Sequence, residues 1–263
     1  MARGARLRGL YAVTPDLDDT ARLAALVEAA IAGGAGAIQY RNKSAGPELR
    51  RQQAAQLARV CFGRGALLIV NDDVALARAV DAHGVHLGEN DGGVAAARAL
   101  VGDKMMIGVS CYNDLARARR LVAEGADYVA FGSFFPSQVK PDACRAEMSI
   151  LAHATTLGVP VVAIGGITAD NARDVIASGA DAVAVISAVF DHDDPAAVTR
   201  AAAALVACFK SRRQVSTLGA AEQTAASVRR TSSAAGPSQG ASAPSGGSAA
   251  AELSNEAASV GVH

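Results

Sequence analysis

The sequence predicts a (β/α)₈ TIM barrel, an α/β fold, and two observations lead to this prediction. Short apolar runs alternate eight times with amphipathic, alanine-rich segments, as expected of parallel strands that are connected by helices. The last two runs lead into a glycine-rich turn and a serine, at the position where this fold binds phosphate groups. We therefore expect residues 1–210 to form the barrel.

The eight expected strands are short and follow one another at regular intervals. Their ranges are 10–14, 37–41, 67–71, 84–87, 106–109, 128–132, 161–165 and 182–186. The last two are continuous apolar runs, because parallel strands in this fold are buried on both faces. Side chains that cap helices precede several of the connecting segments, as at residues 16–19, 113–114 and 168–170.

The composition changes after the barrel. Residues 211–263 are rich in Ser, Ala and Gly and contain few large apolar side chains. Such a segment cannot bury enough apolar surface to offset the entropy lost on ordering, so we expect a low-complexity, disordered C-terminal tail. A tail that docks a partner is the alternative.

Composition also limits the classes of partner. The chain carries 25 basic and 25 acidic residues, so neither a nucleic acid nor a membrane surface is an expected partner. It has no apolar run long enough to span a bilayer, and its basic N-terminus lacks the apolar core of a secretory signal. The four cysteines do not have the spacing of a metal site. We expect a cytoplasmic protein that acts on small molecules, and the sequence leaves a homo-oligomer open.

The end of the second expected strand is cationic. Because side chains alternate along a strand, Gln39, Arg41 and Lys43 share one side, and Tyr40 and Asn42 share the other. Cations that face a barrel interior are costly to desolvate without a ligand, so the first group is a candidate anion clamp. An ion pair at the end of a strand is the alternative.

Carboxylates follow the third and fourth expected strands. Asn71 and Asp72 end the third strand, and Asp91 follows the fourth. Mg²⁺ usually takes one or two protein carboxylates together with phosphate oxygens and water, so Asp72 and Asp91 are candidate ligands for a Mg²⁺ ion that bridges a diphosphate. Helix capping is the alternative for each acid, and we assign Asp73 to it.

Two further segments at this end of the barrel carry candidate binding residues. The loop after the sixth strand ends with Lys140, which would neutralise a departing anion or remain a solvated lysine. Gly165 and Gly166, with Ile186 and Ser187 after the eighth strand, would hold a phosphate through backbone N–H groups. A phosphate ester is therefore the expected ligand.

Together these motifs resemble the thiamine-phosphate synthase family. The similar segments occur in the family's order between about residues 10 and 190, and they are Gln39-x-Arg41-x-Lys43, Asn71-Asp72, the run from His86 to Asp91, Gly108-Val109-Ser110, the loop that ends at Lys140, the Ala-Ile-Gly-Gly-Ile turn and the final apolar-Ser pair. Seven motifs in one order are far more specific than any one of them. The tail lies outside the resemblance.

The resemblance implies a transferase of thiamine biosynthesis. The family condenses 4-amino-2-methyl-5-hydroxymethylpyrimidine diphosphate with 4-methyl-5-(2-phosphoethyl)thiazole, or with its carboxylated tautomer, to give thiamine phosphate and pyrophosphate. The implied mechanism is a dissociative displacement that is assisted by Mg²⁺.

The resemblance also implies roles for individual residues. The catalytic residues would be Arg41, Lys43, Ser110 and Lys140, and the Mg²⁺ ligands would be Asp72 and Asp91. The pyrimidine diphosphate would contact Gln39, Tyr40, Arg41, Asn42, Lys43, Asn71, Ser110 and Lys140, and the thiazole phosphate would contact Ser137, Gln138, Val139, Gly166, Ile186 and Ser187.

The sequence departs from the family pattern at one position, and two other functions are alternatives to the synthase. The family usually has a threonine where this chain has Val139, and losing a hydrogen bond worth about 0.5 to 1.5 kcal/mol should weaken thiazole phosphate binding. A thiazole tautomerase-like isomerase is one alternative, although such isomerases carry a histidine where this chain has Ser133. A non-catalytic phosphate-ligand sensor is the other, and a sensor of a monophosphate would not need the acids Asp72 and Asp91.

Overall fold

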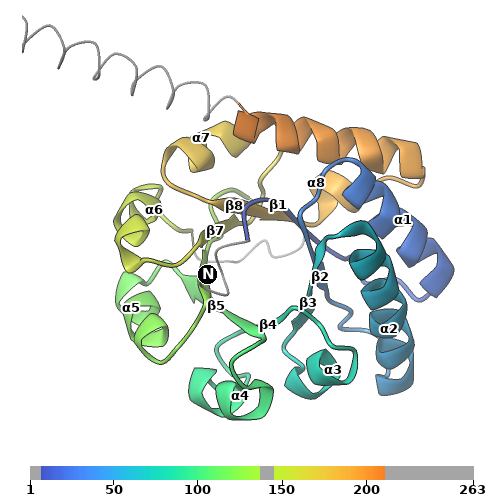
Figure 1. Ribbon diagram of the computed structural model, residues 1–263. Helices are drawn as coiled ribbons and strands as arrows, with labels where there is room; N and C mark the ends of the chain where they lie inside the picture. The colour runs from blue at the N-terminus through green and yellow to red at the C-terminus, as the bar shows by residue number, and fades with distance from the viewer. Residues whose placement is uncertain (1–6, 137–144, 211–263) are drawn as a thin grey trace, which may run out of the picture. The chain divides into compact units, whose positions relative to one another are not determined.

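The computed structural model describes residues 7–136 and 145–210 of the chain. They form a closed barrel of parallel strands, in which each strand pairs with its neighbours in the sequence and the last strand pairs with the first. Figure 1 looks along the barrel, with the strands in the centre and the helices around them. The strands are β1 (Gly9–Val13), β2 (Ala37–Tyr40), β3 (Leu67–Asn71), β4 (Gly84–Leu87), β5 (Met106–Tyr112), β6 (Tyr128–Phe131), β7 (Val161–Ile164) and β8 (Ala182–Val185).

The helices form the outer layer of the barrel. They are α1 (Thr20–Ala32), α2 (Pro47–Arg64), α3 (Val74–Ala79), α4 (Val94–Val101), α5 (Leu115–Ala123), α6 (Ser149–Ala154), the 3₁₀ turn η2 (Thr155–Leu157), α7 (Ala172–Ala177) and α8 (Ser187–Phe190). Residues 195–210 form a further helix. The alternation of strands and helices confirms the predicted TIM barrel.

Each strand lies within about a residue of its predicted range, with one exception. β5 continues beyond Val109 to Tyr112, and its pairing with β6 shifts register between Ser110 and Tyr112. A shift of this kind bends the strand and re-aims its side chains. The apolar pattern ends at Val109, which explains why the sequence predicts a shorter strand.

Several helices begin at the capping residues that the sequence indicates. Asp19, Asp73 and Asp114 each accept a hydrogen bond from a backbone N–H group in the first turn of α1, α3 and α5, at 3.0, 2.8 and 2.8 Å. The predicted capping of α3 by Asp73 is therefore confirmed. α7 differs, because it follows Asn171 rather than the predicted Thr168 or Asp170.

Two apolar layers stabilise the barrel. The interior is filled by side chains such as Tyr11, Ile69, Met106 and Tyr128, whereas a larger cluster fills the space between the strands and the helices. The two sets alternate along each strand, as the period of two requires. The interior layer therefore contains the phenol rings of two tyrosines, which bring polar groups into an otherwise apolar space.

Arg98 of α4 forms a clamp at the N-terminal ends of β5 and β6. Its guanidinium donates hydrogen bonds to the carbonyl groups of Gly102, Met105 and Gly125, at 2.8, 2.7 and 3.0 Å. It also pairs with the Asp127 carboxylate, which accepts a further bond from the backbone N–H of β5 at 2.9 Å. This largely buried cluster ties two strands and one helix together at the end of the barrel opposite the predicted site.

The helix of residues 195–210 completes the outer layer beside α1 (Figure 1). Thr199 Oγ1 donates to the carbonyl of Ala29 at 3.0 Å, and a Cβ atom at Gly33 would lie 2.6 Å from Ala202 Cβ. The predicted tail, residues 211–263, lies outside the described residues. Within the described part of the chain, no helix has both the length and the apolar character needed to cross a membrane.

Candidate active site

The C-terminal ends of the strands meet at one end of the barrel, which we call the C-terminal mouth. Along β2 the predicted alternation of side chains is observed. Gln39 Nε2 donates to Tyr11 Oη inside the barrel at 2.7 Å, whereas Tyr40 Oη donates to Gln53 Oε1 of α2 at 2.9 Å. β2 therefore places Gln39 on the side of the barrel interior and mouth, and Tyr40 on the side of the helices.

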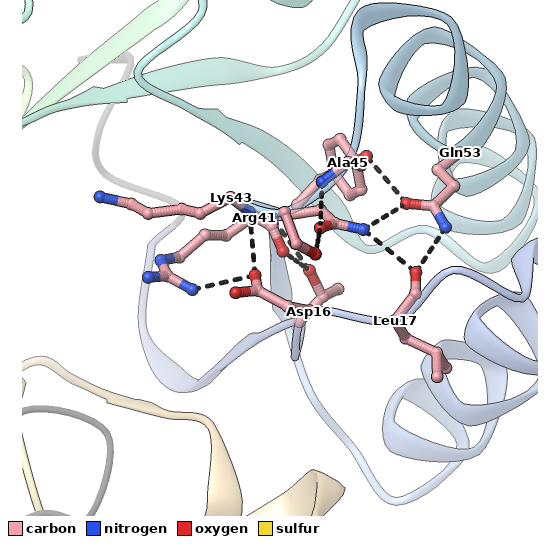
Figure 2. Close-up of polar contacts among 10 residues, drawn as sticks. Asp16, Leu17, Arg41, Lys43, Ala45 and Gln53 are labelled. Atoms are coloured by element: carbon pink, nitrogen blue, oxygen red, sulfur yellow. Dashed lines mark hydrogen bonds and ion pairs between the residues drawn. The ribbon is translucent and has the colours of Figure 1, made fainter.

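Asp16 holds the cationic segment after β2 in place. Its Oδ1 accepts hydrogen bonds from Arg41 Nη1 at 3.2 Å and from the Lys43 backbone N–H at 2.9 Å. Figure 2 shows the Arg41 and Lys43 side chains running in the same direction beside Asp16, with Gln53 on the opposite side. Arg41 thus forms the ion pair that the sequence left as an alternative, while the exposed Lys43 ammonium forms none with a described residue.

Tyr40 and Asn42 support this segment from behind. Gln53 Oε1 accepts hydrogen bonds from Tyr40 Oη at 2.9 Å and from Asn42 Nδ2 at 3.1 Å, and Asn42 Nδ2 also donates to the Leu17 carbonyl at 3.0 Å. Both side chains also line the cavity described below. Because these donors already have protein partners, the two residues hold the clamp rather than offer free donors to a ligand.

Asp72 and Asp91 lie in contact at the mouth. Burial and the neighbouring Asp91 carboxyl raise the pKa of Asp72 to about 6, against the opposing effects of Lys43 and of a hydrogen bond with Asn71. Asp91 Oδ2 accepts a hydrogen bond from the Gly88 backbone N–H at 2.7 Å, and it does not cap α4. The capping alternative therefore does not account for Asp91.

This acidic pair fits a divalent cation. Burial, together with the neighbouring Asp91 carboxyl, makes the negative charge of Asp72 costly, and a Mg²⁺ ion bound by one or two protein carboxylates would offset that cost. The described residues contain no group of three or more His, Cys, Asp or Glu side chains that could hold a metal ion. A pair of carboxylates completed by substrate oxygens and water is consistent with that finding.

A cavity of about 230 Å³ lies between the ends of β2 and β3 and the helices α2 and α3. Its lining includes Arg41, Lys43, Asn71 and Asp72, so the structure brings the cationic segment and one of the acids to a common space. Arg50 of α2 also lines it, and its buried Nε has no hydrogen-bond partner in the described part of the chain. Arg50 is not predictable from the sequence, because nothing distinguishes it from the other arginines of that helix.

Ser110 is linked to Gln39 through the barrel interior. Tyr11 Oη lies 3.0 Å from Tyr128 Oη, Tyr128 Oη lies 2.9 Å from His86 Nδ1, and His86 Nε2 lies 2.9 Å from Ser110 Oγ. Burial lowers the pKa of His86 to about 4, so its imidazole is neutral near pH 7. No local sequence signal assigns the two tyrosines to the site, and the histidine is indicated only by the motif from His86 to Asp91.

The predicted phosphate turn follows β7. Gly165 and Gly166 have φ angles of 102° and 62°, which favour glycine, and Asn171 closes the turn by donating to the Gly166 carbonyl at 3.0 Å. Ser187 begins α8 at the end of the neighbouring β8, directly after Ile186. The backbone N–H groups of Gly166 and Ser187 form no hydrogen bond with a described residue. Among the described residues these two donors are unpaired, as an anion-binding turn requires.

The beginning of the loop after β6 packs against this turn. A Cβ atom at Gly166 would lie 2.3 Å from the Pro136 carbonyl oxygen, so the approach of the two segments requires glycine. Ser133 Oγ donates to the carbonyl of Phe135 at 2.8 Å. Four predicted site residues of the same loop, Ser137, Gln138, Val139 and Lys140, lie outside the described residues.

Comparisons with known proteins agree with this arrangement. The family model described as "Thiamine monophosphate synthase" matches residues 10–189. A protein of Methylobacillus flagellatus named thiamine-phosphate synthase is 56% identical over 188 residues, which cover 72% of this chain and 90% of that protein. A protein of Chromobacterium violaceum with the same name is 56% identical over 198 residues, which cover 75% of this chain and 96% of that protein.

A solved structure is also similar. Thiamine phosphate pyrophosphorylase from Pyrococcus furiosus has a TM-score of 0.69 and 35% sequence identity, and the match covers 80% of this chain and 98% of that one. The sequence and structural matches cover the barrel and the predicted site motifs. This chain therefore belongs to the thiamine monophosphate synthase family.

Proposed function

We propose that this protein is a thiamine-phosphate synthase, which joins 4-amino-2-methyl-5-hydroxymethylpyrimidine diphosphate to 4-methyl-5-(2-phosphoethyl)thiazole. One observation carries the proposal: Arg41 and Lys43 share a cavity with Asp72, at the same mouth as the Gly165-Gly166 turn. A cationic clamp beside an acidic pair suits a diphosphate with Mg²⁺, and the turn suits a second phosphate. The names of the relatives support this substrate pair.

Departure of the diphosphate is the difficult step of this reaction. The bond between the pyrimidine methylene carbon and the diphosphate oxygen breaks, and its electron pair leaves with the oxygen. Arg41 and Lys43 provide positive charge that is already in place where negative charge develops. Mg²⁺, held by Asp72 and Asp91, would add positive charge at the diphosphate oxygens.

The second step joins the two rings. The electron-rich aminopyrimidine supports positive charge on its methylene carbon, which accepts the lone pair of the thiazole nitrogen. That nitrogen carries no proton, so the reaction needs no general base. The N–H groups of Gly166 and Ser187, which are unpaired among the described residues and lie next to Ile186, would hold the thiazole phosphate and so keep the nucleophile close to the carbon. Ser137, Gln138, Val139 and Lys140 complete the proposed site.

A direct assay tests the proposal. Purified protein is given both substrates with Mg²⁺, and thiamine phosphate and pyrophosphate are measured, with a chelator as the second condition. We expect equal amounts of the two products with Mg²⁺ and almost none with the chelator. Turnover of the carboxylated thiazole tautomer alone would indicate the isomerase, and binding of a phosphate ester without any turnover would indicate the sensor. We also propose a cytoplasmic enzyme, because phosphorylated substrates do not cross membranes unaided.

Asp16 should affect binding of the diphosphate without touching it. Asp16→Ala removes an ion pair worth about 0.5 kcal/mol and a hydrogen bond worth about 1 kcal/mol, so the KM for the pyrimidine diphosphate should rise about tenfold. Asp16→Asn retains an acceptor for the Lys43 N–H group and should have a smaller effect. Steady-state kinetics with each substrate varied in turn provides the measurement, and equal KM values for Asp16→Ala and wild type would contradict the prediction.

Arg50 should contribute to the same binding site. Arg50 lines a cavity that already contains two cations, and its buried Nε has no hydrogen-bond partner among the described residues, an arrangement that an anionic ligand would stabilise. We expect Arg50→Met to raise the KM for the pyrimidine diphosphate about three- to tenfold, and to leave the KM for the thiazole phosphate unchanged. Arg51→Met is the matched control, because the exposed Arg51 pairs with Glu48 on the same helix. Equal effects of the two substitutions would show that Arg50 has no specific role.

A further inference from the structure

Five polar side chains from five different strands form one continuous chain of hydrogen bonds across the barrel interior. In order they are Gln39, Tyr11, Tyr128, His86 and Ser110. Tyr11 and Tyr128 are 1% and 0% exposed, so water does not compete for their hydroxyl groups. The two ends of this hydrogen-bond chain, Gln39 and Ser110, are predicted to contact the pyrimidine substrate. The three residues between them have no role in the reaction steps proposed above.

The hydroxyl protons of the two tyrosines determine the direction in which the hydrogen bonds of this chain run. Each tyrosine hydroxyl has one proton, and burial raises the pKa of both phenols, so both protons remain bound. Gln39 Nε2 donates a hydrogen bond to Tyr11 Oη, and the Tyr11 hydroxyl in turn donates a hydrogen bond to Tyr128 Oη. The reverse order would leave the Tyr11 proton buried without an acceptor, which is costly.

The direction continues to the other end of the chain. Tyr128 then donates to His86 Nδ1, which must be the unprotonated ring nitrogen, so the imidazole proton lies on Nε2. His86 Nε2–H donates to Ser110 Oγ. The Ser110 oxygen is thereby occupied as an acceptor from inside the barrel, and its own O–H group is left to donate at the mouth.

The packing around Tyr128 holds the middle of the chain. Its ring stacks on His86 at a centroid distance of 5.6 Å and meets Tyr11 edge to face at 6.2 Å. A Cβ atom at position 108 would lie only 1.8 Å from Tyr128 Cζ, so Gly108 provides the space for the ring. The phenol is therefore fixed in the geometry that connects the two ends.

We propose that Tyr11, Tyr128 and His86 are positioning residues. Their hydrogen bonds run in one direction and orient the side chains of Gln39 and Ser110 so that both can bind the aminopyrimidine ring. With one N–H group used on Tyr11, Gln39 still offers its carbonyl oxygen and a second N–H group. An amino group beside a ring nitrogen, as in a 4-aminopyrimidine, presents the complementary donor and acceptor. Ser110 offers the donor at the opposite side of the mouth. This inference rests on the proposed function for the identity of its ligand.

Kinetics with Tyr128→Phe tests the positioning role, because the variant loses one hydroxyl and keeps the ring. We expect the KM for the pyrimidine diphosphate to rise about tenfold and the KM for the thiazole phosphate to stay within about twofold. A purely structural role would lower kcat and leave both KM values unchanged, which would overturn the inference. Tyr112→Phe is the control, since Tyr112 is 41% exposed and lies outside the chain of hydrogen bonds.

Coupling between the ends gives a second kinetic criterion. If the chain orients Ser110 through His86, then Ser110→Ala must have a much smaller effect on the KM for the pyrimidine diphosphate in the Tyr128→Phe background than in wild type. Equal effects of Ser110→Ala in the two backgrounds would show that the chain does not transmit orientation, and would overturn the inference.

Nitrogen-15 NMR of the histidine rings tests the direction without any turnover. The full chain has five histidines, and the His86 signals are identified by their absence in His86→Gln. We expect the Nε2–H tautomer in wild type and a mixture of tautomers in Tyr128→Phe. A wild-type Nδ1–H tautomer would overturn the proposed direction. Because this readout needs neither substrate, it separates failure of the inference from failure of the proposed function, which only the product assay decides.

Discussion

Asp72→Asn should reduce kcat by on the order of 100-fold or more, while making the metal-free protein more stable. The loss of activity follows from the proposed role of Asp72, since the variant would lose a charged ligand for Mg²⁺ where the diphosphate departs. Asparagine is the appropriate substitution, since Asp72 has a φ angle of 63° and asparagine tolerates this left-handed conformation. Steady-state kinetics over a range of Mg²⁺ concentrations provides the measurement, and Asp114→Asn, which alters only the N-cap of α5, is the control.

The gain in stability should depend on pH in a defined direction. The pKa of Asp72 is raised to about 6 in the folded protein, so the folded state binds this proton more tightly than the unfolded state does. Wild type therefore loses stability relative to Asp72→Asn as the pH rises from about 4 to above 6, and the difference is constant at higher pH. Because Asp72 is partly exposed and solvent weakens its interactions, we expect about 1 kcal/mol, or about 2 to 4 °C in Tm.

Thermal unfolding with a chelator at pH 4.5 and at pH 7.5 measures this difference, at about the two ends of the titration. Added Mg²⁺ should raise the Tm of wild type more than that of Asp72→Asn, because the ion binds the folded acidic pair. A variant that is less stable than wild type at the higher pH without metal would contradict our account of the raised pKa.

Gly108→Ala should lower stability by about 3 kcal/mol or more, and the Tm by about 10 °C. The new methyl group would overlap the Tyr128 ring, since a Cβ atom at this position lies 1.8 Å from Cζ. The ring cannot move without breaking its hydrogen bonds to Tyr11 and His86. We therefore expect the KM for the pyrimidine diphosphate to rise together with the fall in Tm.

Two further variants isolate the cause. In a Tyr128→Ala background the space is empty, so Gly108→Ala should add almost no further destabilisation. Gly63→Ala is the matched control, because a Cβ atom there meets nothing within 4 Å in α2, and alanine should raise stability by about 0.5 to 1 kcal/mol. If the cost of Gly108→Ala is the same with and without the Tyr128 ring, the overlap is not its origin.

The fold was predictable because its signals are local. A few consecutive residues are enough to identify each apolar run and each capping aspartate, such as Asp19 and Asp114. The eight strands are predicted from these local signals alone. The alternation of β2 was predictable for the same reason, since it requires only a period of two. The end of β5 was not predictable, because its shift of register depends on pairing with β6.

The parts of the site that escaped prediction depend on contacts between distant segments. Tyr11 and Tyr128 are 117 residues apart, and only closure of the barrel brings their hydroxyl groups together. From their neighbours in the sequence alone, both tyrosines are expected to be ordinary strand residues. The position of Asp16 before α1 predicts a helix-capping role, yet this residue binds the segment after β2. The acids Asp72 and Asp91 were predictable as neighbours because the ends of adjacent strands must meet at the mouth.

The clamp around Arg98 has a consequence for how this protein can change over time. It ties α4 to the N-terminal ends of β5 and β6, at the opposite end of the barrel from the residues that would contact substrate. Substitutions that improve this end can therefore accumulate without altering specificity, and they enlarge the margin within which the loops at the other end tolerate destabilising changes. Laboratory evolution toward a new substrate should accordingly progress further from a parent whose Arg98 clamp has first been reinforced.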